Sequence, residues 1–178
     1  MLRRLMRVLP LPTVAVLGNH DLAISRDPQA RASDLTELEP ATLLRDEGLM
    51  LELLGRNVWV AGADARLIVR RRPKLDPNRL ARDDADLSIL VCHYPRVLEL
   101  LEPGRFDLVL AGHMHDGQIA LPYPGGKLRF AHLSERFTAG VYRSPVATMH
   151  VSAGLGTTFV PLRFAARPEA TELVLRPS

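Results

Sequence analysis

The chain has little of several features that would mark particular classes of protein. It contains one cysteine, Cys92, which excludes an intrachain disulfide and fits a reducing compartment. No apolar run approaches the roughly 20 residues that span a bilayer. The net charge is only +3, with 23 basic residues interspersed among 20 acidic ones, so no nucleic-acid-binding surface is indicated. No repeat, low-complexity tract or linker divides the sequence, and we expect a single domain over residues 1–178.

The amino-terminal stretch MLRRLMRVLPLPTVAVLG has basic residues before an apolar run, which superficially resembles a secretory signal. Pro10 and Pro12 interrupt that run, and no small-residue cleavage pattern precedes Asn19. We therefore interpret the stretch as a short amphipathic helix over residues 1–9 followed by a strand over residues 13–17. On this interpretation the chain, as given, is soluble.

The next part of the chain alternates short elements with polar loops. Pro40 is a good first-turn residue, and it predicts a helix that ends at Glu47 before Gly48. Residues 49–53 and 57–61 predict two strands of a hairpin. The charged segment that follows, over residues 64–86, is interpreted as a solvated loop with a short helix and is assigned no chemistry.

Two apolar strands then follow, each ending in histidine. The strand over residues 87–92 is predicted to be wholly buried, and Pro95 opens a helix after it. The second strand covers residues 108–111 and ends in the sequence Gly-His-Met-His. Strands that alternate with helices predict an α/β fold.

Four of the six histidines lie just beyond the carboxyl ends of predicted strands, where open α/β sheets place their ligands; they are His20, His93, His113 and His115. Each of them alone is better explained as a structural residue, but four together indicate a site. Imidazole nitrogens and amide or carboxylate oxygens suit Zn, Mn or Fe. The spacing of His113 and His115 directs both side chains to one side if the strand geometry persists.

Three separated motifs carry a more specific signal: GNHD at residues 18–21, CHYP at 92–95 and GHMHDGQI at 112–119. Their order and spacing resemble those of the calcineurin-like metallophosphoesterases. The sequence over residues 154–175, GLGTTFVPLRFAARPEATELVL, is similar to the tail of a bacterial membrane-associated phosphodiesterase branch of that family. The resemblance covers nearly the whole chain and implies a metallophosphoesterase-type αββα sandwich, here truncated at the amino terminus.

The resemblance implies that Asn19, His93 and His113 bind one metal ion and that His115 binds a second. Two cations about 4 Å apart clamp phosphate oxygens and activate a hydroxide for attack on phosphorus. The implied reaction is metal-dependent hydrolysis of a phosphomonoester or phosphodiester, with Mn, Zn or Fe as the metal. The branch favours a diester, with a lipid-linked or nucleotide-sugar head group as the substrate class.

The resemblance makes His20 a catalytic residue and not a ligand, because the matching histidine of the family protonates the leaving oxygen. Asp21 either orients the His20 imidazole or caps the following loop, and both readings stay open. Asp116 stands where the family more often has glycine. Aspartate tolerates a left-handed backbone better than most residues, so we expect the loop to survive this departure.

The family also carries Asp-x-His and Gly-Asp motifs upstream of Gly-Asn-His, and neither occurs in the 178 residues. The second metal would keep one protein ligand, His115, so we expect at most one well-bound cation. We therefore expect the chain to be part of a metal-dependent phosphoesterase and, by itself, to have weak activity or none. The alternative is a non-catalytic remnant or binding module with a partial metal site, and a third reading has another subunit supply the carboxylates.

Two consequences follow from the same deficit. A strand over residues 13–17 without its usual neighbours has unpaired hydrogen-bonding groups, which favours self-association. Family relatives often carry an amino-terminal membrane segment or export signal. The location therefore stays open between the cytoplasm and the periphery of a bacterial membrane.

Overall fold

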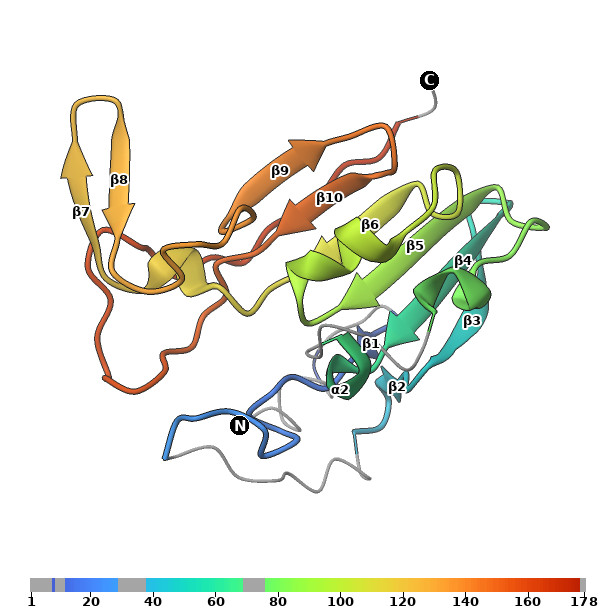
Figure 1. Cartoon of the computed structure of the whole chain (residues 1–178). Helices are drawn as coiled ribbons and strands as arrows, with labels where there is room; N and C mark the ends of the chain where they lie inside the picture. Colours follow the sequence, from blue (N-terminus) through green and yellow to red (C-terminus); the bar gives the residue numbers. More distant parts are fainter. Residues whose placement is uncertain (1–7, 9–11, 29–37, 69–75, 177–178) are drawn as a thin grey trace.

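A six-stranded sheet forms the centre of the computed structural model, which describes residues 8, 12–28, 38–68 and 76–176. Its strand order is β3-β4-β5-β6-β10-β9 (Figure 1). The inner strands β4 to β6 and β10 run parallel, whereas the outer strands β3 and β9 are antiparallel to their neighbours. The bounds are β3 Glu47–Leu53, β4 Arg56–Ala63, β5 Leu87–Cys92, β6 Leu108–Ala111, β9 Gly140–Arg143 and β10 Thr148–Val151. The predicted α/β class is confirmed.

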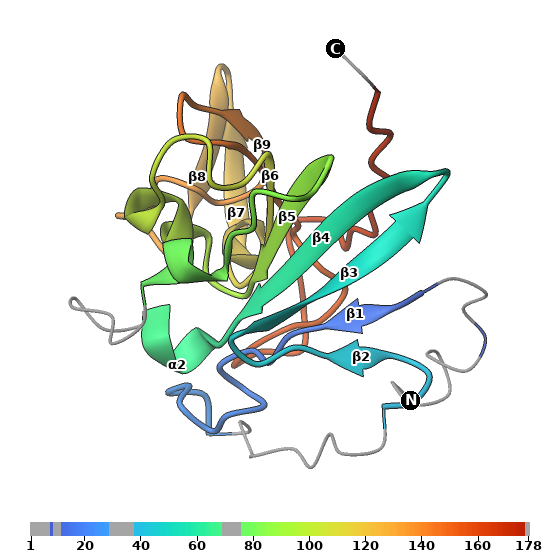
Figure 2. The ribbon, with the colours of Figure 1, turned by 90° about the vertical axis from the view of Figure 1, so that its right-hand side faces the viewer.

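Two small strand pairs flank this sheet. Strands β1 (Val14–Ala15) and β2 (Thr42–Leu43) pair in parallel and lie beside β3 and β4 (Figure 2). Strands β7 (Ala120–Tyr123) and β8 (Gly126–Arg129) form an antiparallel hairpin that projects from the other end of the molecule (Figure 1).

The helices are short: α2 Ala65–Ile68, η1 Pro77–Leu80, η2 Pro95–Leu100 and η3 His115–Gly117. None of the helices within the described ranges has the length and apolar character needed to cross a membrane. The helix expected over residues 1–9 falls outside the described residues, except for Val8. The charged segment after β4 contains two short helices, α2 and η1, but the expectation that it is solvated is wrong for Ala65, Ile68 and Pro77, whose side chains are buried.

The helix predicted from Pro40 to Glu47 is wrong. The amide groups of Thr42 and Leu44 donate to the carbonyl oxygens of Thr13 and Ala15, so this segment pairs with β1 as an extended strand. The buried side chain of Leu44 adds apolar contacts with β4. Long-range pairing therefore outweighs the local helix signal. Gly48, expected to end the helix, lies inside β3, where a Cβ atom would approach the Trp59 ring.

The strand over residues 87–92 has the predicted bounds but is not wholly buried. Leu90 and Cys92 face an apolar cluster that includes Val97 of η2 and Met149 of β10. The alternate side chains of β5 are only partly buried. The reason is that, among the described residues, the short β1–β2 pair on the opposite face packs mainly against β4. Thr171 and Leu173 of the carboxyl-terminal segment only line a cavity beside Val91 of β5.

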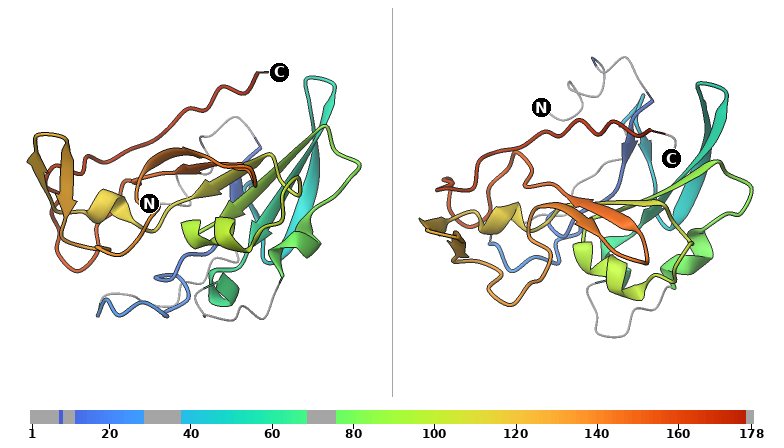
Figure 3. Two further views of the ribbon diagram at one scale, coloured as in Figure 1. Left: turned by 45° about the horizontal axis from the view of Figure 1, so that its top comes forward. Right: turned by 90° about the horizontal axis from the view of Figure 1, so that it is seen from above.

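The carboxyl-terminal segment returns across the molecule after β10. It reaches the β7–β8 hairpin, where Phe164 pairs with Gln118 and Ala120 through backbone hydrogen bonds, and then runs back along the sheet (Figure 3). This path brings residues 154–164 beside loops that precede them by more than a hundred positions.

Candidate metal centre

The loop after β1 is a tight turn that buries Asn19. The amide of Leu22 donates to the Gly18 carbonyl, and the Asn19 carbonyl accepts from Ile24. The Asp21 carboxylate accepts a hydrogen bond of 2.9 Å from the Gly18 amide. Of the two readings left open by the sequence, this contact supports the loop cap.

Three predicted ligands meet at the carboxyl ends of β1, β5 and β6. His93 Nε2 lies 2.7 Å from Asn19 Oδ1 and 3.0 Å from His113 Nδ1. His93 directly follows β5, and the Gly112 amide donates to its carbonyl, which holds the loops after β5 and β6 together. His113 has a left-handed backbone, with φ of 70°, a strained conformation found at functional sites. The expected convergence of these side chains is present.

Burial keeps both imidazoles of this group neutral. It lowers the pKa of His93 to about 4, and neighbouring histidines contribute to the decrease. Burial, followed by the nearby His93, lowers the pKa of His113 to about 3. Aromatic rings enclose the pair: the Tyr94 ring lies 4.4 Å and the His132 ring 5.2 Å from the His113 ring, measured between centroids. A neutral imidazole is the form that binds metals.

The donor set fits one divalent cation. An amide oxygen and two neutral imidazoles resemble the three protein ligands of catalytic metal sites, which leave a position open. Across residues 8, 12–28, 38–68 and 76–176, no group of three or more His, Cys, Asp and Glu side chains could hold a metal ion. The three-donor set therefore includes the amide of Asn19, and no carboxylate of the described residues completes a second set.

His115 contacts the carboxyl-terminal segment, and it is close enough to His93 and His113 to contribute to their lowered pKa values. Its Nδ1 atom is 2.9 Å from Arg163 Nη2 and 3.2 Å from the Gly156 carbonyl oxygen. Burial and then the charge of Arg163 lower its pKa. Arg163 also donates to the His115 carbonyl oxygen, so it fastens this segment to the His115 loop. The role of His115 as a ligand stays a prediction.

His20 has polar neighbours that the sequence motifs do not contain. Its Nε2 atom lies 3.1 Å from Thr158 Oγ1 and 3.8 Å from the carboxylate of Asp27. The Thr158 hydroxyl donates to Asp27 over 2.8 Å, and the Phe159 amide donates to the same oxygen. Asp27 is only 5% exposed. Asp27, rather than Asp21, is thus the carboxylate linked to His20. The sequence motifs did not indicate this link; the signal in the sequence was the family-like tail that contains Thr158.

Replacing Thr158 by valine is expected to lower the free energy of unfolding by about 1–3 kcal/mol, because buried Asp27 loses a hydrogen-bond donor. The serine variant keeps the hydroxyl and should retain most of the stability. Urea unfolding of both variants measures the difference, and ¹⁵N NMR of the His20 ring reports its environment. Equal stability of the valine and serine variants would show that the hydroxyl does not hold the segment.

Comparison with known proteins identifies the family. The sequence profile described as calcineurin-like phosphoesterase matches residues 1–117. The chain belongs to this family. It is similar to the uncharacterized protein YpbG of Bacillus subtilis, with 32% identity over 89% of this chain and 56% of the relative.

Two further relatives carry informative names. The uncharacterized metallophosphoesterase YkuE of B. subtilis is 29% identical over 94% of this chain and 57% of its own length. The phosphodiesterase YaeI of Escherichia coli is 26% identical over 92% of this chain and 58% of its own length. The chain thus spans little more than half of each of these relatives. No solved structure matches it significantly.

The departure from the usual glycine of the family at Asp116 is accommodated. Asp116 adopts φ of 52°, within a run of left-handed residues that includes Gly117 and Gln118. Its buried carboxylate accepts hydrogen bonds of 2.8 Å from Lys127 Nζ and Arg129 Nε. The substitution therefore ties the β7–β8 hairpin to the loop that carries His115.

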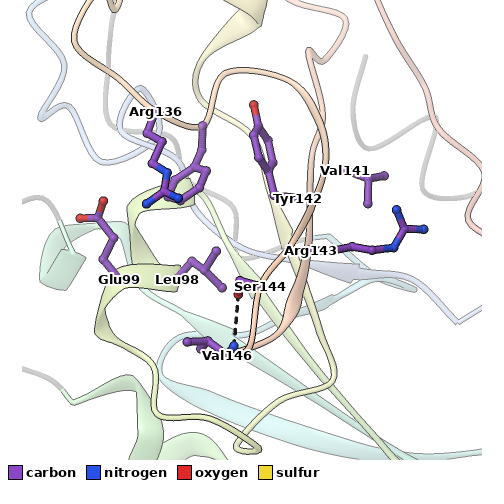
Figure 4. A pocket seen from close by; sticks show the side chains of 9 residues that line it. Leu98, Glu99, Arg136, Val141, Tyr142, Arg143, Ser144 and Val146 are labelled. Atoms are coloured by element: carbon purple, nitrogen blue, oxygen red, sulfur yellow. Dashed lines mark hydrogen bonds between the residues drawn. The ribbon is translucent and has the colours of Figure 1, made fainter.

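Two cavities differ in their relation to this centre. One, of about 300 Å³, is lined by His93, Gly112 and His150 and opens beside the predicted ligands. The larger, of about 410 Å³, lies between η2 and β9 and is lined by Leu98, Tyr142 and Val146, with Arg136 and Glu99 beside it (Figure 4). Its lining contains none of the predicted site residues. The smaller cavity is therefore the one that adjoins the predicted ligands.

Proposed function

We propose that this chain carries the histidine-rich part of the active site of a divalent-metal-dependent phosphodiesterase. The observation that supports this most is the convergence of Asn19, His93 and His113 on one point. A cation held there supplies Lewis acidity toward a phosphoryl oxygen. The choice of a diester follows the similarity to YaeI, which is named a phosphodiesterase.

His20 is the proposed general acid for the leaving oxygen, since its side chain is 38% exposed and neighbours Asn19 in the turn. Thr158 and Asp27 act as positioning residues, because they hold one edge of the imidazole and leave the rest of the ring accessible. In an active form of the enzyme, His20→Ala should lower turnover while metal content is retained, as expected of an acid and not of a ligand.

The proposed substrate is a phosphodiester with a lipid-linked or nucleotide-sugar group, and Mn, Zn or Fe is the proposed metal. At most one such ion is held well by the described residues, because His115 alone offers a second ion one ligand.

Self-association through the two-residue strand β1 is also proposed, and sedimentation of the purified chain tests it.

Hydrolysis of bis(p-nitrophenyl) phosphate with added Mn²⁺ tests the function, with metal content measured on the same samples. The chain of 178 residues should bind metal and hydrolyse the diester barely above background. A version extended ahead of Met1 by Asp-x-His and Gly-Asp segments should be active, because a carboxylate then screens the repulsion between two cations. Strong two-metal activity from the 178 residues would contradict the expected deficit.

A second candidate function is a metal-binding module without catalysis. It is favoured by the contact between His115 and Arg163, because the guanidinium places a positive charge against the predicted ligand of the second metal ion. The same experiment separates the two. An extended version that holds two metal ions and stays inactive would support the binding module and contradict the hydrolase.

A further inference from the structure

The β7–β8 hairpin has two chemically different faces. Leu121 is paired with Leu128, and directly opposed residues of an antiparallel pair point to the same face. Tyr123 and Phe130 share this face because side chains alternate along a strand. All four side chains are between 48% and 60% exposed. The hairpin thus presents an uncovered apolar surface.

The other face of the hairpin is fastened to the loop that carries His115. Lys127 and Arg129 point to this face and bind the buried carboxylate of Asp116. Packing is close, since a Cβ atom on Gly117 would lie 2.6 Å from the Cβ atom of Arg129. An isolated two-stranded hairpin is marginally stable in water, so these contacts hold the apolar face in a defined orientation.

A second exposed apolar segment joins the base of the hairpin. Phe164 exchanges backbone hydrogen bonds with Gln118 and Ala120. The segment exposes five large apolar side chains: Leu155, Phe159, Val160, Leu162 and Phe164. We call residues 119–130 together with residues 155–164 the apolar lobe. It stands away from the six-stranded sheet, at the hairpin end of the molecule (Figure 1).

The apolar lobe itself carries cations and no acidic residue, although the buried carboxylates of Asp116 and Asp27 contact it. Residues 117–134 and 154–168 contain no aspartate or glutamate, although the chain has 20 acidic residues in 178. The same two stretches contain Lys127, Arg129, Arg163 and Arg167. Lys127 and Arg129 share the single carboxylate of Asp116, so the lobe keeps a net positive charge. An apolar surface with positive charge beside it is the chemistry of surfaces that bind anionic lipid headgroups.

We propose that the apolar lobe docks onto the surface of an anionic lipid bilayer. Leu121, Tyr123, Leu128 and Phe130 enter the interfacial region, where a tyrosine places its ring in apolar surroundings and its hydroxyl in water. A lipid surface is favoured over a protein partner because one face of a two-stranded hairpin is small compared with the roughly 1,200–2,000 Å² that a stable protein interface buries. Docking sets the His115 loop at headgroup level, which favours a lipid-linked phosphodiester; this last point alone rests on the proposed function.

Binding of the full chain to vesicles tests the docking without any substrate. The chain should co-sediment with vesicles of phosphatidylcholine mixed with phosphatidylglycerol, and much less with phosphatidylcholine alone. The double variant Leu121→Ser/Leu128→Ser should lose about tenfold or more in partitioning, because two apolar side chains no longer leave water. Arg167→Glu should weaken binding to the anionic vesicles only.

The matched control is Leu54→Ser, at the tip of the β3–β4 hairpin, where the residue is fully exposed and lies outside the apolar lobe. It should bind vesicles as the parent does, and circular dichroism establishes that every variant is folded. Absence of vesicle binding, or equal binding by the double variant, would overturn the proposal. A dimer that depends on Leu128, without vesicle binding, would overturn it in favour of a second copy as the occupant.

Discussion

Replacement of His93 by alanine is expected to lower the affinity of the chain for Mn²⁺ by about 100-fold or more, since loss of even an outer-shell partner costs 10–100-fold. His93 is the central donor of the group, because its Nε2 atom contacts both Asn19 Oδ1 at 2.7 Å and His113 Nδ1 at 3.0 Å. Its removal leaves only two donors, Asn19 Oδ1 and His113 Nδ1, without the imidazole that contacts both. Calorimetric titration of the metal-free chain with Mn²⁺ measures the loss.

The control for this variant is His132→Ala. The His132 ring packs 5.2 Å from the His113 ring, between centroids, so the variant removes an adjacent histidine that is not a predicted ligand. Its Mn²⁺ affinity should stay near the parent value. Thermal unfolding without metal identifies any loss of the fold. A His93→Ala chain that binds Mn²⁺ as tightly as the parent would disprove the assigned centre.

Gly117→Ala is expected to be the most destabilising of the glycine replacements in the His115 loop. Gly117 has φ of 79°, and an added Cβ would lie 2.6 Å from the Cβ atom of Arg129. The left-handed backbone costs alanine roughly 1–2 kcal/mol, and the overpacking adds about 1–3 kcal/mol. The free energy of unfolding in urea measures the sum, and the ion pairs of Asp116 with the hairpin should weaken with it.

Gly104 provides a matched control, since it has the same φ of 79° but open space around its added Cβ. Gly104→Ala should therefore show the backbone cost alone, of roughly 1–2 kcal/mol. Equal destabilisation by the two alanine variants would mean that Arg129 moves aside freely. The hairpin would then not be held closely against the loop.

Elements made by local pattern were predictable. The strands over residues 87–92 and 108–111 have the expected bounds, because each is a short apolar run that ends at a turn. The hairpin predicted over 49–53 and 57–61 forms with slightly longer strands, and Leu54 and Gly55 turn it with left-handed backbones. The three histidine-bearing motifs identified the family that the profile match shows.

Elements that form by pairing with a distant part of the chain were not predictable from the sequence. Residues 42–43 became a strand because β1 and the segment after residue 38 lie side by side, which no local signal records. The partly buried face of β5 has the same origin, since a run of apolar residues does not reveal how completely each face of the strand is covered.

The sequence by itself determined which donor types stand after which strands: the amide of Asn19 and the imidazoles of His93 and His113. Only the tertiary structure decided their neighbours. Thr158 reaches His20 across 138 positions of sequence, and Arg163 reaches His115 across 48. Such contacts depend on how the carboxyl-terminal segment folds back over the sheet. The path of the backbone decides where this segment lies. Its hydrogen bonds join residues that are far apart in the sequence, and no periodic pattern of residues predicts such pairs.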